Sequence, residues 1–151
     1  MTALEIVDLP ADRLPGEVLA VPMFEDQRPL DGPVAVVDWR LDGALTRMVI
    51  GGELTGRNGE NLALQSNPKF ASPWILVAGC GRWRSLDRES YMMLIGRLLK
   101  LAAKAGRSEL ALCLPPSDGV DALELERMVR EALIGSSRLT VCRLSRVARF
   151  A

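Results

Sequence analysis

Trp74-Ile75-Leu76-Val77-Ala78, followed by Gly79-Cys80-Gly81 and then by a long amphipathic segment, is the stretch that decides the fold. Five consecutive apolar residues between polar segments are typical of a strand that is buried on both faces. Residues 87–105 carry apolar side chains at helical spacing, with Asp87 as an N-cap and Gly106 after the last lysine. A buried strand followed by a helix predicts an α/β fold.

The same alternation continues toward the C-terminus. A second apolar strand is expected at 109–114, a helix from Asp121 to Gly135, and a last strand at 139–144. Parallel strands that are joined by helices require right-handed crossovers. This half of the chain therefore predicts a largely parallel sheet.

The N-terminal half adds shorter elements. We expect strands at 4–9, 17–24 and 61–65, a helix at 33–40 and a second short helix ending at Ile50. Asn58-Gly59 between extended segments predicts a hairpin turn and hence antiparallel pairing. We therefore predict one domain over residues 1–151, a three-layer α/β/α sandwich with a mixed, largely parallel sheet.

Composition supports a globular protein, because 48% of the 151 residues are hydrophobic and 25% are charged. The longest apolar runs fall well short of the roughly 20 residues that a membrane span needs. Residues 1–5 lack the basic and apolar regions of a secretory signal. We therefore expect a cytoplasmic protein.

The cysteines are three in number and far apart. Cys113 and Cys142 lie in apolar runs, which favours small buried side chains over a disulfide framework. Cys80 lies between two glycines in an expected loop, so we expect it to be more exposed.

The chain has 19 basic and 19 acidic residues, and zero net charge argues against a dedicated nucleic-acid binder. The charge is unevenly distributed, since residues 1–35 hold seven acids and two arginines. Residues 138–151 hold no acid and four arginines: Arg138, Arg143, Arg146 and Arg149. Two interpretations stay open for this basic tail, a solvated strand face or a surface for phosphate or an acidic partner.

The residues that most enzymes use are missing. The sequence has no histidine, which excludes His-based triads and His-containing metal sites. It also has no phosphate-binding loop motif, no G-x-S-x-G and no Cys-x-x-Cys. We therefore predict no catalytic residue, no metal site and no cofactor.

The best candidate ligand site is the loop between the central strand and the long helix. Ligands of open α/β sheets bind outside the carboxyl ends of strands, and glycines let backbone N–H groups approach an anion. An arginine here can pair with phosphate, and the tryptophan can stack on a base. The alternative is a tight turn without a ligand. The candidate residues are Gly79, Cys80, Gly81, Arg82 and Trp83.

The helix at 87–105 supplies a candidate interface. Its stretch at 91–95 is apolar on more than one face, which indicates burial in the core or under a partner. Methionines there can be core filler or interface anchors. The candidate interface residues are Tyr91, Met92 and Met93.

Four stretches in this order carry a family resemblance: 24–30 (FEDQRPL), 37–45 (VDWRLDGAL), 59–64 (GENLAL) and 77–81 (VAGCG). With them the chain resembles the N-terminal domain of the M17 leucyl aminopeptidases, over roughly residues 3–147. The resemblance rests on ordered pattern and not on a catalytic signature. It implies a macro-domain-like α/β/α fold.

In that family the dinuclear zinc site and the peptidase residues lie in a separate C-terminal domain. Its Asn-Thr-Asp-Ala-Glu-Gly-Arg signature is absent from these 151 residues, which stop where that domain is expected to begin. No catalytic residue is therefore carried over. The resemblance implies roles of the N-terminal domain in hexamer assembly and, in some members, in DNA binding.

Three hypotheses follow. The leading one is a non-catalytic assembly or regulatory domain, which associates with itself or with a protein partner. The second is a binding module for a nucleotide or ADP-ribose-like ligand, which uses the loop at 79–83. The third is a DNA-binding accessory domain, which uses the basic tail at 138–149 and the basic edge of the helix at 87–105.

Overall fold

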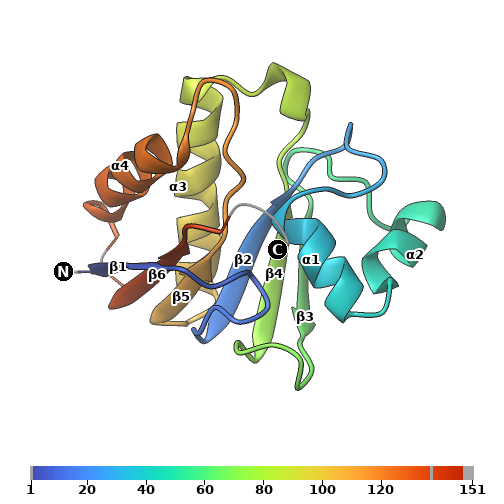
Figure 1. The fold of residues 1–151 in the computed structure, drawn as a ribbon, viewed down its shortest axis with the longest axis horizontal. Coiled ribbons are helices and arrows are strands. Elements are labelled where there is room, and N and C mark those ends of the chain that lie inside the picture. The colour runs from blue at the N-terminus through green and yellow to red at the C-terminus, as the bar shows by residue number, and fades with distance from the viewer. Residues whose placement is uncertain (1, 137, 148–151) are drawn as a thin grey trace.

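Six strands form one sheet in the computed structural model of the chain, which describes residues 2–136 and 138–147 (Figure 1). Neighbouring strands are parallel except for β3 and β4, which are antiparallel. From one edge to the other the order is β1 (Ala3–Val7), β6 (Val141–Ser145), β5 (Glu109–Leu112), β2 (Val18–Met23), β4 (Trp74–Gly79) and β3 (Asn61–Gln65). Arg149 of the basic tail lies outside the described residues.

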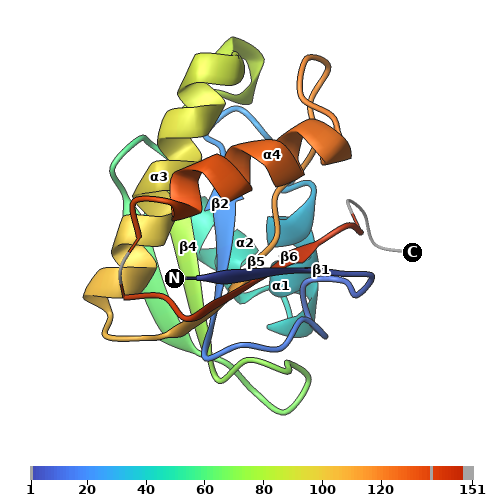
Figure 2. The same ribbon diagram turned by 90° about the vertical axis from the view of Figure 1, so that its left-hand side faces the viewer.

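Helices cover both faces of the sheet (Figures 1 and 2). The longer pair, α3 (Arg88–Lys104) and α4 (Ala122–Leu133), packs on one face, and the shorter pair, α1 (Pro33–Arg40) and α2 (Ala44–Ile50), packs on the other. The three-layer sandwich with a mixed, largely parallel sheet is thus confirmed.

Side chains at the helix ends explain where α3 and α4 begin. Asp87 accepts a hydrogen bond from the Ser90 N–H at 2.8 Å. Asp121 does the same for the Glu124 N–H, also at 2.8 Å. Each carboxylate satisfies one of the N–H groups that a first helical turn leaves without a partner, so both expected caps are confirmed.

The core lies on both sides of the central strands. All six residues of β2 are buried. Val18 and Ala20 face the α3/α4 layer, whereas Leu19 and Val21 face the α1/α2 layer. A strand that is covered on both faces accounts for the continuous apolar runs in the sequence.

The expected hairpin at Asn58-Gly59 is wrong. The antiparallel partner of β3 is β4, and residues 66–73 connect the two strands. The segment before β3 is a compact loop because the Glu60 carboxylate accepts hydrogen bonds from the Thr55 and Gly56 N–H groups, each at 2.8 Å. The Glu60 N–H also donates back to the Arg57 carbonyl at 3.0 Å, which closes a turn within this loop.

The cysteines are free thiols. Cys113 and Cys142 are buried, as their apolar surroundings in the sequence indicate, and Cys80 is half-buried. Within residues 2–136 and 138–147, no helix has the length and apolar character needed to cross a membrane.

Candidate functional site

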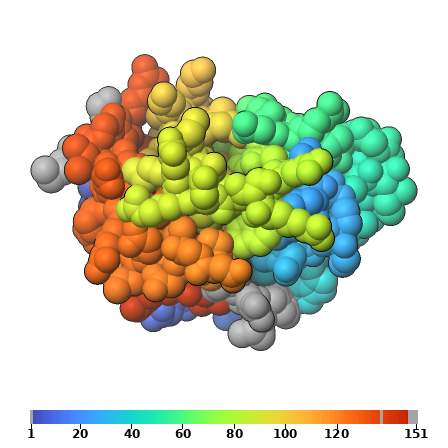
Figure 3. Space-filling view, turned by 90° about the horizontal axis from the view of Figure 1, so that it is seen from above, coloured from blue at the N-terminus to red at the C-terminus, as the bar shows by residue number. Residues whose placement is uncertain are grey.

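The loop Gly79–Trp83 lies at the carboxyl edge of the sheet. Seen from above, it runs beside the segments that follow β2 and β5 (Figure 3). Sequence reasoning therefore placed this loop correctly at the carboxyl edge of the sheet. The chemistry of the loop differs from the expected anion cradle, as its hydrogen bonds show.

The backbone N–H groups of the loop are used within the chain. Three of them donate to backbone carbonyls that flank it, from Gly79 to Glu60 (2.6 Å), from Cys80 to Met23 (2.8 Å) and from Gly81 to Gly56 (3.0 Å). A phosphate would have to displace these bonds before it could bind there.

A carboxylate fills the next part of the loop. Asp26 accepts hydrogen bonds from the Trp83 N–H at 2.8 Å and from the Arg84 N–H at 3.1 Å. Burial raises the pKa of Asp26, but those N–H groups and the Arg84 charge outweigh it and hold the pKa below the usual value. The ionised carboxylate thus occupies the N–H groups that an anionic ligand would need.

The first glycine of the loop is required by packing. A Cβ atom at Gly79 would lie 2.2 Å from the Arg57 carbonyl oxygen and 2.9 Å from the carbonyl carbon of Gly56. Gly81 has a positive φ of 79°, a conformation that glycine adopts at little cost. Both glycines are thus explained without a ligand.

Arg97 is a functional candidate that sequence reasoning missed. Its guanidinium donates to the carbonyls of Gly79 and Glu60 and to the side chains of Asn58 and Asn61, the last at 2.7 Å. It therefore ties α3 to the ends of β3 and β4. The one feature of the sequence that could have indicated Arg97 is its place among the apolar positions of the long helix.

The other charged and reactive groups of the loop are less constrained. Arg82 is mostly exposed and pairs with Glu25 at 3.4 Å. Burial raises the pKa of the Cys80 thiol to about 11, against the opposing charge of Arg97. Because the thiolate is the reactive form, Cys80 is a poor nucleophile at neutral pH.

A hollow of about 490 Å³ lies between this loop and α3, and we call it the α3 hollow. Its lining includes Cys80, Gly81 and Arg82 from the loop and Met93, Leu94 and Arg97 from α3. The structure thereby brings three of the candidate ligand residues together with one of the candidate interface residues.

The three candidate interface residues point in different directions. Tyr91 is fully buried, and its hydroxyl donates to the Pro115 carbonyl at 2.5 Å. Met92 is half-buried against the same core, whereas the Met93 side chain is 72% exposed. Successive helical residues point about 100° apart, so Tyr91 faces the sheet and only Met93 offers most of its surface to a partner.

A second cleft of about 780 Å³ opens at the carboxyl ends of β2, β4 and β5. Trp83 lines it, with its ring edge-on to Phe24 at a centroid distance of 5.0 Å. Arg84 brings a positive charge to the cleft, and Asp31 and Asp118 bring two negative ones. This cleft has the size for a small molecule.

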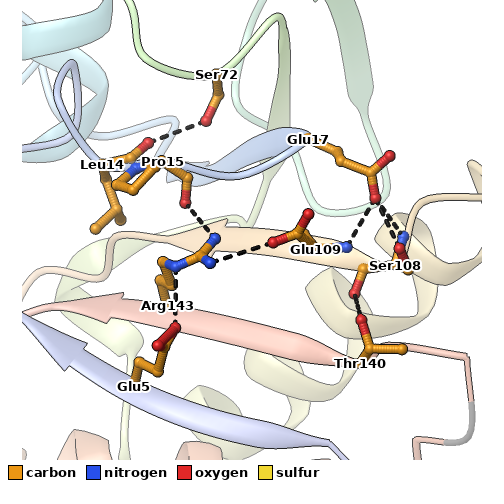
Figure 4. Close-up of polar contacts among 9 residues, drawn as sticks. All are labelled: Glu5, Leu14, Pro15, Glu17, Ser72, Ser108, Glu109, Thr140 and Arg143. Atoms are coloured by element: carbon orange, nitrogen blue, oxygen red, sulfur yellow. Dashed lines mark hydrogen bonds and ion pairs between the residues drawn. The ribbon is translucent and has the colours of Figure 1, made fainter.

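Two arginines of the basic tail are paired with acidic residues. Arg143 lies between Glu5 at 3.0 Å and Glu109 at 3.2 Å (Figure 4). Arg146 holds both carboxylate oxygens of Asp8, at 2.9 and 3.0 Å. The parallel pairing of β1 with β6 brings these opposite charges together, which accounts for the uneven charge of the sequence.

In the part of the chain that the structure describes, no three His, Cys, Asp or Glu side chains form a group that could hold a metal ion.

Comparison with known proteins identifies the family. The model of the N-terminal domain of the cytosol aminopeptidase family matches residues 20–140. The chain belongs to this family.

A probable cytosol aminopeptidase of Idiomarina loihiensis is 31% identical over 123 residues, which are 82% of this chain and 24% of that protein. One of Colwellia psychrerythraea is 29% identical over 76% of the chain and 23% of the relative. The chain thus spans about a quarter of the length of these aminopeptidases.

Solved structures confirm the macro-domain-like fold of this aminopeptidase-family domain. A mutant of tomato leucine aminopeptidase superposes with a TM-score of 0.71 and 17% identity, over all of this chain and 34% of the tomato chain. The macrodomain of Mycobacterium tuberculosis DarG gives a TM-score of 0.66 and 14% identity, over 95% of this chain and 98% of its own. At such identities the likeness concerns the fold alone.

Proposed function

We propose that this domain is a non-catalytic assembly domain that self-associates through the α3 hollow. The observation that carries the proposal is Met93, a large apolar side chain that is 72% exposed at the rim of a hollow. Exposed apolar surface beside a concave site is typical of protein-binding surfaces.

The surroundings of Met93 support a protein partner over a small ligand. Leu86 and Leu94 add apolar surface to the hollow. The guanidinium of Arg97 is already held by four acceptors of the chain, so it is poorly placed to bind a free anion. The chain belongs to an aminopeptidase N-terminal family whose relatives are named cytosol aminopeptidases, which supports a cytoplasmic location.

Light scattering over a range of protein concentrations tests this function. The wild type should gain mass with concentration, and Met93→Glu should stay monomeric because it places a charge in the apolar contact. Ile50→Glu is the matched control, since Ile50 is 80% exposed on α2 in the opposite layer. A wild type that stays monomeric at high concentration, or an Ile50→Glu variant that dissociates as fully as Met93→Glu, would contradict the proposal.

A second candidate function is the binding of a nucleotide or ADP-ribose-like ligand. The cleft at the carboxyl ends of β2, β4 and β5 favours it, together with the macro-domain-like fold. One of the structural neighbours is Thermosipho africanus DarTG in complex with ADP-ribose. Calorimetric titration with ADP-ribose and common nucleotides is the test, and a flat titration would remove this candidate.

In the third hypothesis, DNA binding through the basic tail and the basic edge of α3, two of the arginines are already paired with acids, whereas Arg138, Lys100 and Lys104 form no ion pair between described residues. Arg143 and Arg146 both form ion pairs with carboxylates of the chain. Neutralised arginines release few counterions from DNA, so we expect weak binding at most.

A further inference from the structure

The C-terminal halves of α3 and α4 enclose a second groove of about 470 Å³, which we call the α3–α4 groove. Figure 2 shows the C-terminal ends of both helices on the side of the molecule that carries the N-terminus. The groove shares no lining residue with the α3 hollow. An inference about it therefore goes beyond the proposed function and can fail independently.

Three cations surround the groove, Lys100 and Lys104 from α3 and Arg138 from the segment before β6. All three are exposed, and none of them takes part in an ion pair between described residues. Lys104 lies in the last turn of α3, where a cation complements the helix dipole. Arg138 lies outside both helices, so the dipole does not explain it.

A glycine inside α3, Gly96, is a second and independent indication that the groove has an occupant. It lies inside α3, where glycine is less stable than alanine, and a Cβ atom there would meet nothing within 4 Å. No neighbour within the described chain therefore requires a glycine at this position. Gly96 lines the groove, and because it has no side chain, the backbone of a partner segment can approach α3 closely there.

The floor of the groove is apolar. Leu99 and Ala103 contribute to it from α3, and Ala132 contributes from α4. A partner segment that contacts both the apolar floor and the cations at the rim needs apolar side chains along one side and carboxylates along the other. We propose that the α3–α4 groove binds an acidic, amphipathic segment of a partner protein.

Nucleic acid fits the same groove less well. No aromatic side chain lines it, whereas single-stranded nucleic acids bind by stacking on aromatic rings. Duplex DNA is held by many phosphate contacts, more than the three cations of this groove can supply. Three cations around an apolar floor therefore favour a short peptide segment.

Fluorescence anisotropy tests the proposal on the full chain with a labelled helical peptide that carries leucine at positions i, i+3, i+4 and i+7 and glutamate on the opposite face. The wild type should bind with an affinity that falls as salt rises. An exposed ion pair changes the affinity by about 1.4- to 5-fold, so removing the three cations together with Lys100→Ala, Lys104→Ala and Arg138→Ala should weaken binding by about 3- to 100-fold. Lys69→Ala is the control, because Lys69 is a lysine outside the groove.

Gly96→Ala separates binding from folding. It should raise the melting temperature, because alanine favours the helix, and still weaken peptide binding, because its methyl group fills the groove. Three results would overturn the proposal: no binding by the wild type, equal binding by the triple variant, or tighter binding of duplex DNA than of the peptide.

Discussion

Replacement of Gly79 by alanine should destabilise the domain by several kcal/mol. The added Cβ would lie 2.2 Å from the Arg57 carbonyl oxygen, and ordinary contact begins at 3.4 Å, so the two must separate by about 1.2 Å. Overpacking of this kind costs about 1–3 kcal/mol. Moving the loop also strains the bonds from Gly59 to Gly79 and from Gly81 to Gly56, each worth about 1 kcal/mol.

We therefore expect a loss of about 3–4 kcal/mol, a large share of the roughly 5–15 kcal/mol that stabilise a typical domain. Urea unfolding followed by tryptophan fluorescence and circular dichroism measures it. Gly119→Ala is the control, because a Cβ there meets nothing within 4 Å, and it should change the stability by less than about 0.5 kcal/mol. A Gly79→Ala variant within about 1 kcal/mol of the wild type would refute the packing explanation and favour a ligand role for this glycine.

Three further predictions concern side-chain contacts. Arg40→Leu should cost about 3 kcal/mol in urea unfolding, because it leaves the buried Asp12 carboxylate without the partner that it now has at 2.8 Å; an unchanged midpoint would contradict this. Hydrogen bonds from the Ser108 N–H and hydroxyl hold the pKa of Glu17 below its ordinary value of 4.5. The stability that Glu17 adds is thus present above pH 4.5 and lost as the pH falls through the lower, folded-state pKa. Glu17→Gln should therefore flatten the acid side of a stability–pH profile, and a parallel profile would argue otherwise. Arg97→Lys should cost about 1–2 kcal/mol, since an ammonium cannot hold the four acceptors of the planar guanidinium. Calorimetry should show a lower melting temperature, and an unshifted one would contradict this role of Arg97.

Local sequence signals located most of the fold. Asp87 and Asp121 marked both long helices because a cap acts on N–H groups only three residues away. The apolar run at 74–78 indicated a central strand because such a strand is buried on both faces. The hairpin expected at Asn58-Gly59 failed because a side chain, Glu60, organises that loop.

The position of the candidate loop could be predicted from the sequence, but its contacts could not. The Gly79–Trp83 loop lies where the strand–loop–helix pattern predicts, yet Asp26, far away in sequence, occupies two of the N–H groups that extend it. Tyr91 and Met93 are two positions apart, and only the structure shows which one faces the core. Contacts between distant segments decided each of these points, and one sequence does not reveal them.

Hydrogen exchange at low and high protein concentration tests the central claim, self-association through the α3 hollow, most directly. At high concentration we predict slower exchange in residues 80–87 and in the first turns of α3, where Met93 and Leu94 line the hollow. Exchange in α2, in the opposite layer, should not change. Equal exchange around Met93 at both concentrations, or slower exchange in α2 alone, would contradict the account.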